Sequence, residues 1–208
     1  MNRSESTDSH TATGAGRPGN VDAIPSLGRS LLTGGLGFCL VSVCVFATVA
    51  FAERWMYTRL GVFGAYLAWT ALFILLGGGV MGSLVVGRWR PPRFYLLFGA
   101  AFFMYAAGWV GAYFVLRGTA GEIVGSLAGA LLMGTVFAAG FGVSRFALNL
   151  FVILFVANSV GYFLGSALNE TVRGSTGMLL WGATYGLCLG AGLGAVLHFA
   201  QARRASTS

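Results

Sequence analysis

The chain has 208 residues, of which 56% are hydrophobic and only 9% are charged. Soluble domains carry about 25% charged residues, so this composition excludes a soluble globular protein and indicates an integral membrane protein. The net charge of +7 comes from arginine, because the chain contains no lysine. The three cysteines all lie inside apolar runs without paired spacing, so we expect no metal site and no cofactor.

The N-terminal segment 1–30 is rich in Ser, Thr and Gly and predicts a disordered tail, since it has little apolar surface to bury. The first apolar run, Leu31–Ala52, has no charge and is long enough to cross a bilayer. Its end, Ala50-Phe51-Ala52 before Glu53, also fits a signal-peptide cleavage site. We favour a retained span, because the run is longer than a usual signal-peptide core, and cleavage stays open as the alternative.

Five further apolar runs follow, each separated from the next by a short charged or polar segment. They cover residues 60–87, 94–116, 122–144, 146–168 and 177–200. With the first run they predict an all-α, polytopic membrane domain of six transmembrane helices over residues 31–200. Residues 201–208 would then form a short C-terminal tail.

Arginine is distributed unequally between the two sides of this predicted bundle. One side carries a basic cluster without carboxylates, made of Arg88, Arg90, Arg93, Arg145 and His198. By the positive-inside rule this side is cytoplasmic, which places both termini inside the cell, in a membrane that we expect to be the bacterial inner membrane. The cluster either binds anionic lipid headgroups or only sets topology. His198 either binds the Arg145 loop or a lipid headgroup, or only extends its polar tip to the membrane interface.

The opposite, outer side carries three carboxylates, Glu53, Glu122 and Glu170, each near an arginine. One interpretation is a ring of negative charge that selects cations at the outer mouth of a path. The other is a set of exposed, partly neutralised surface groups. Both stay open.

A weak internal repeat accompanies the helices. The pairs Arg93-Phe94, Arg145-Phe146 and His198-Phe199 are 52 and 53 residues apart and all lie at the predicted cytoplasmic boundary. Two interpretations stay open: three two-helix hairpins, each with one bulky and one glycine-rich helix, or chance matches between boundary arginines and frequent phenylalanines. Repeats of this kind are common in transporters.

The last run contains a row of glycines at four-residue spacing, Gly182, Gly186, Gly190 and Gly194. On a helix these residues lie one above another, so they form a groove without side chains. In a bilayer such a groove lets another helix approach to backbone contact. We therefore predict that the last span is a packing hub.

Polar side chains mark the fifth run. Asn158, Tyr162 and Ser166 are four residues apart and share a helix face, and Asn149 lies further toward the start of the run. This polar seam either lines a substrate or water path or provides hydrogen bonds between helices.

No ionisable residue lies in mid-membrane, which argues against a proton relay and against catalysis. The expected function is a non-enzymatic, small permease- or channel-like subunit that works as an oligomer or in a complex. The alternative is an accessory or scaffold subunit without a transport path. We expect membrane lipids, a second copy or a membrane-complex partner as contacts, and no nucleic acid.

Overall fold

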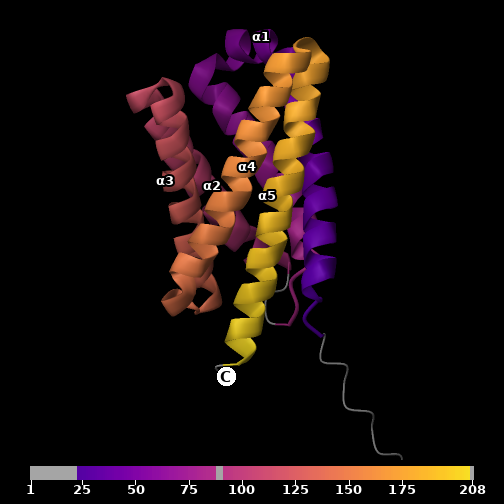
Figure 1. Ribbon diagram of the computed structural model, residues 1–208, viewed down its shortest axis with the longest axis vertical. Coiled ribbons are helices and arrows are strands. Elements are labelled where there is room, and N and C mark those ends of the chain that lie inside the picture. The colour runs from indigo at the N-terminus through magenta and orange to yellow at the C-terminus, as the bar shows by residue number, and fades with distance from the viewer. Residues whose placement is uncertain (1–22, 88–90, 207–208) are drawn as a thin grey trace, which may run out of the picture.

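The computed structural model describes residues 23–87 and 91–206, and this part of the chain is all-helical, which confirms the predicted fold class. Five helices in it are long and apolar enough to cross a membrane. They lie side by side with their axes roughly aligned (Figure 1). The elements are α1 (Leu27–Gly82), α2 (Pro91–Leu116), α3 (Gly118–Phe141), the short 3-10 helix η1 (Ser144–Phe146), α4 (Ala147–Val172) and α5 (Gly174–Ala205).

Helix α1 contains the first two apolar runs and bends between them at Gly61, whose φ of 67° and ψ of 177° are not helical. Its first arm, residues 27–60, and its second arm, residues 62–82, run antiparallel. The indole Nε1 of Trp69 donates to Thr48 Oγ1 at 3.0 Å. The count is thus five helices rather than six separate ones, because the charged segment 53–59, expected to be a loop, continues the first arm.

Two further connections use the same backbone conformation as Gly61. Arg117 has φ 53° and ψ 166°, and Arg173 has φ 57° and ψ 170°. A residue other than glycine in this region costs about 1–3 kcal/mol. All three bends lie at one end of the bundle, the upper end in Figure 1, which we name the turn end. The opposite end, where the chain has its C-terminus, is named the terminal end.

The helices form a closed circuit in chain order. The second arm of α1 packs on α2, where the rings of Phe73 and Phe102 lie 5.2 Å apart. Then α2 packs on α3, α3 on α4, and α4 on α5. The circuit closes where α5 packs on the first arm of α1, the most extensive contact between two helices of the described chain.

The glycine row of α5 lies in this closing contact. A Cβ added at Gly186 would lie 2.7 Å from the Phe38 carbonyl oxygen, and one at Gly190 would meet Gly34 and Phe38. Gly182 faces Phe46, and Gly194 faces the backbone of Ser30. The row therefore lies along the first arm of α1, within the same chain.

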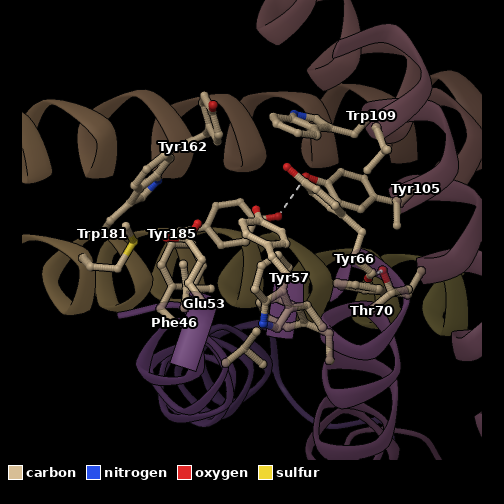
Figure 2. Close-up of a pocket in the computed structure, with 18 residues that line it drawn as sticks. Phe46, Glu53, Tyr57, Tyr66, Thr70, Tyr105, Trp109, Tyr162, Trp181 and Tyr185 are labelled. Carbon is tan, nitrogen blue, oxygen red and sulfur yellow. Dashed lines mark hydrogen bonds between the residues drawn. The ribbon is translucent and has the colours of Figure 1, made fainter. Parts of the chain in front are cut away.

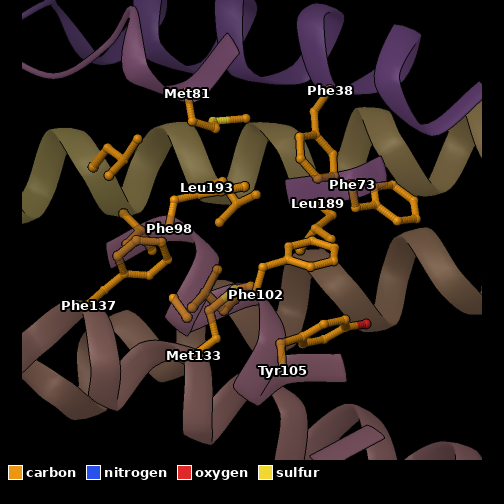
Figure 3. Close-up of a cluster of buried hydrophobic side chains, with 14 of the residues drawn as sticks. Phe38, Phe73, Met81, Phe98, Phe102, Tyr105, Met133, Phe137, Leu189 and Leu193 are labelled. Atoms are coloured by element: carbon orange, nitrogen blue, oxygen red, sulfur yellow. The ribbon is translucent and has the colours of Figure 1, made fainter. Parts of the chain in front are cut away.

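The terminal-end half of the bundle is filled with apolar side chains (Figure 3). Its members are fully or almost fully buried, and they come from α1, α2, α3 and α5: Phe38, Met81, Phe98, Met133, Phe137, Leu189 and Leu193. The interior of this half is thus a close-packed core.

Candidate functional site

The turn-end half of the bundle contains a partly open cavity of about 340 Å³ (Figure 2). Eleven of its 18 lining residues are aromatic, and Glu53 is the only charged one. The aromatic members are Phe46, Tyr57, Tyr66, Trp69, Phe73, Phe102, Tyr105, Trp109, Tyr162, Trp181 and Tyr185. The remaining members are mostly small or aliphatic.

Eight of these rings form a continuous series around the cavity, with centroids 5.2–6.5 Å apart from one ring to the next. We name this series the aromatic cage. In order it contains Trp109, Tyr162, Trp181, Phe46, Tyr185, Phe73, Phe102 and Tyr105. The series closes on itself because Tyr105 and Trp109 are one helical turn apart on α2.

A hydrogen-bonded network lies at the inner boundary of the cavity. Asn158 of α4 is fully buried; its Oδ1 accepts from the Tyr105 hydroxyl, and its Nδ2 donates to Ser126 Oγ, both at 2.6 Å. The Tyr105 and Tyr185 hydroxyl oxygens lie 2.8 Å apart. Because the Tyr105 proton goes to Asn158, Tyr185 donates to Tyr105 and keeps its own oxygen as an acceptor beside the cavity.

Two carboxylates lie around this site. Glu53 is exposed and lines the cavity. Glu122 of α3 accepts a hydrogen bond from the Tyr162 hydroxyl at 3.2 Å.

Two indole nitrogens are unused. Nε1 of Trp109 and Nε1 of Trp181 are buried and have no hydrogen-bond partner within residues 23–87 and 91–206. A buried N–H without an acceptor costs about 1–3 kcal/mol. Neither nitrogen has accessible surface on the cavity, so the cage presents these two indoles to the cavity through their rings rather than through their N–H groups.

The structure brings together only part of the predicted polar seam. Asn158 belongs to the network and Tyr162 to the cage, whereas Ser166 is half-buried outside the cavity lining and Asn149 is exposed. Of the outer carboxylates, Glu53 and Glu122 lie at the site, and Glu170 is exposed at the end of α4. Of the three, only Glu53 lines this cavity.

Sequence reasoning missed most of the cage. Phe102, Tyr105 and Trp109 have the i, i+3, i+7 spacing of one helix face, and that spacing was a usable signal on α2. The rings of α1 and α5 include the i, i+4 pairs Trp69–Phe73 and Trp181–Tyr185, a weaker signal of two residues each.

The predicted basic cluster lies at the terminal end. The guanidinium of Arg145 lies 4.7 Å from the Phe146 ring centre, and that of Arg203 lies 4.9 Å from the same ring. His198 Nδ1 lies 2.8 Å from the Pro25 carbonyl oxygen, so it contacts the segment before α1 rather than the Arg145 loop. Arg93 is exposed. Arg88 and Arg90 lie outside the described residues.

A buried amide that the sequence analysis did not single out also lies at this end. Gln201 of α5 accepts from the Val86 backbone N–H at 2.9 Å and donates to the Leu84 carbonyl at 3.0 Å. It ties the end of α5 to the segment that follows α1.

Among the described residues, no three His, Cys, Asp or Glu side chains lie close enough to hold a metal ion. In comparisons with protein-family models, curated proteins and solved structures, this chain matches none of them.

Proposed function

We propose that this chain is a six-span, permease-like membrane protein that binds a small ligand in the aromatic cage. The observation that carries the proposal is the cavity itself. Its volume of about 340 Å³ falls at the lower end of the range of small-molecule sites, about 300–1,000 Å³. The polar groups at its inner boundary are already paired, which keeps the rings in defined positions.

The six-span topology is supported by the bend in α1. The second arm, residues 62–82, is 21 residues long (82 − 62 + 1) and the first arm is longer, so each arm reaches the roughly 20 residues that a bilayer requires. The arginine asymmetry of the sequence supports an orientation with the turn end outside and both termini in the cytoplasm. The cavity would then face the outer side of the membrane.

A three-hairpin repeat is supported by the three bends. Hairpin one consists of the two arms of α1, hairpin two of α2 and α3, and hairpin three of α4 and α5. Gly61, Arg117 and Arg173 share one rare backbone conformation and are 56 residues apart (117 − 61 and 173 − 117). Seventeen residues after each bend stands a glycine, and each packs on a helix of the next hairpin in the circuit. The contacts are Gly78 with Tyr95, Gly134 with Phe151, and Gly190 with Phe38.

The cavity lining follows the same register. Eight residues after the bend, hairpins one and three place Trp69 and Trp181 at the cavity; twelve residues after it, they place Phe73 and Tyr185 there. The lining residues thus agree in spacing as the bends do, and both agreements support an origin of the domain by duplication of one hairpin.

The closed terminal-end half favours a permease over a channel. Phe98, Phe137 and Leu193 are fully buried there, and an aqueous path through them would need the hairpins to separate. A permease alternates between such states, whereas a channel needs a continuous path. A homo-oligomer or a partner in a membrane complex remains part of the proposal.

Cysteine accessibility tests this function without knowledge of the ligand. In a background where Cys39, Cys44 and Cys188 are replaced by alanine, Ala106→Cys places a thiol in the cavity lining. The matched control is Ala107→Cys on α2, outside the cavity lining and on the surface of the bundle, where a membrane-embedded side chain faces lipid rather than water. An impermeant thiol reagent is applied to either side of oriented vesicles.

A permease predicts that Ala106→Cys reacts from both sides and that the control reacts from neither. Reaction from the outer side only would contradict alternating access. That result, together with a stoichiometric partner on purification, would instead support the accessory or scaffold subunit.

A further inference from the structure

We infer that the aromatic cage binds a monovalent organic cation with an apolar body, such as a quaternary ammonium, with Glu53 as its counter-charge. The inference rests on the proposed function and names its ligand class. It starts from the unusual lining, in which eleven aromatic side chains accompany a single charged group, and that group is negative.

The π-face of an aromatic ring carries partial negative charge, so a cation over it is attracted, by about 0.5–1 kcal/mol when exposed and by about 2 kcal/mol or more when desolvated. Neighbouring cage rings are tilted rather than coplanar; Tyr162 and Trp181 make an angle of 68°, and Phe46 and Trp181 one of 59°. The walls therefore present ring faces in several directions. Tryptophan, the strongest cation–π partner, contributes three lining residues.

The charge pattern around the cage excludes an anionic ligand. Arg54, Arg59, Arg117 and Arg173 all lie near the turn end, yet none of them lines the cavity. The charge that faces the cavity or supports its wall is negative: the Glu53 carboxylate lines it, and the Glu122 carboxylate accepts from the Tyr162 hydroxyl. The tyrosine hydroxyls of the lining are neutral and can donate or accept. An anion would meet repulsion here without a compensating cation.

A polar neutral ligand also fits poorly. Asn158 has its amide oxygen and its amide nitrogen already bonded, and the Tyr105 hydroxyl both donates and accepts within the network. Apart from Glu53, Thr70, the indoles and the tyrosine hydroxyls, the lining offers no polar side chain, so a sugar-like ligand would lose more hydrogen bonds to water than the lining could replace. A quaternary ammonium has no N–H to satisfy, so ring faces and one carboxylate are sufficient.

The test is a titration of the purified full chain with phenyltrimethylammonium, followed by quenching of tryptophan fluorescence, with detergent alone as the blank. Its neutral isostere tert-butylbenzene and the anion 4-tert-butylbenzoate are titrated in parallel. We expect the cation to bind at least tenfold more tightly than the isostere, and the anion not to bind.

Two variants test how much Glu53 and Trp181 contribute to the affinity for the cation. Glu53→Gln should weaken binding of the cation about tenfold, the equivalent of about 1.4 kcal/mol, and leave the isostere unchanged. Trp181→Leu should weaken the cation about fivefold to tenfold; Trp181→Phe, which keeps a ring, replaces it if the leucine variant does not fold. Matched controls outside the cavity lining are Glu170→Gln and Trp55→Leu, and both should bind as the parent does.

Equal affinity for cation and isostere would overturn the inference, and so would an unchanged cation affinity in Glu53→Gln. Absence of cation binding would overturn it as well. In each case two-sided labelling of Ala106→Cys would still support the permease. Failure of the ligand inference is therefore distinguishable from failure of the proposed function.

Discussion

The contact between α5 and the first arm of α1 yields a quantitative prediction at Gly186. A Cβ added there would meet the Ser42 Cβ first, and it would also lie 2.7 Å from the Phe38 carbonyl oxygen and 2.8 Å from the Cys39 Cα. Carbon approaches a carbonyl oxygen to about 3.3 Å, so the two helices must separate by at least about 0.6 Å. Two of these neighbours are backbone atoms and the third is a Cβ, whose position the backbone fixes, so none of them can rotate away.

Overpacking of this kind costs about 1–3 kcal/mol. Replacement of glycine by alanine also changes helix propensity, by up to about 1 kcal/mol in favour of alanine. Gly111→Ala on α2 measures this second effect alone, because a Cβ there meets nothing within 4 Å. We therefore expect Gly186→Ala to be less stable than Gly111→Ala by about 1–3 kcal/mol, and Gly186→Leu to be less stable still.

The assay is reversible unfolding of the purified chain by denaturing detergent, followed by circular dichroism. Gly99→Ala serves as an intermediate case, since its Cβ would meet only the Ile74 side chain at 3.4 Å, an ordinary contact. Equal stability of the Gly186→Ala and Gly111→Ala variants would refute the reasoning, because it would mean that the glycine row carries no close backbone contact.

Three further predictions concern single polar or strained positions, each checked by the same unfolding assay. Asn158→Leu should lose about 1–3 kcal/mol because it leaves a tyrosine and a serine hydroxyl without their shared partner, whereas Asn149→Leu, at an exposed position of the same helix, should change little. Gln201→Leu should lose about 1–3 kcal/mol because a buried backbone N–H and carbonyl become unpaired; a loss below 0.5 kcal/mol would mean that water replaces the amide. Arg117→Gly and Arg173→Gly should each gain about 1 kcal/mol, since glycine adopts a φ near +55° without strain, and a loss in both would show that the arginine side chains matter more than the backbone.

The helical fold could be predicted because bilayer physics leaves few alternatives. Long apolar runs must satisfy their backbone groups internally, so composition and run length are enough to indicate helices. The segment 53–59 misled the prediction because charge was taken as a helix break. Those residues are compatible with a helix, and the chain turns at Gly61, where backbone conformation rather than polarity decides.

The site was much harder to predict. Asn158 and Tyr162 stood out because polar residues are rare within apolar runs, and both lie at the cavity. The aromatic residues did not stand out, because aromatic side chains are ordinary in membrane helices and the cage takes them from four helices. Their convergence depends on the order in which the hairpins pack, which no local pattern in the sequence states.

The glycines and the cage are parts of one arrangement. In hairpin two, Gly125 and Gly129 of α3 lie directly behind Trp109 and Tyr105.

In hairpin three the roles of the helices are exchanged: Gly165 of α4 lies against the Trp181 ring of α5, and Gly161 lies against the Tyr185 backbone. Bare backbone thus contacts the rings of Trp109, Tyr105 and Trp181 and leaves them little freedom to turn. Rings fixed before a ligand arrives lose little entropy on binding, which is the advantage of a preorganised site. The glycine stripes therefore do more than bring helices together, because they hold the walls of the cavity in place.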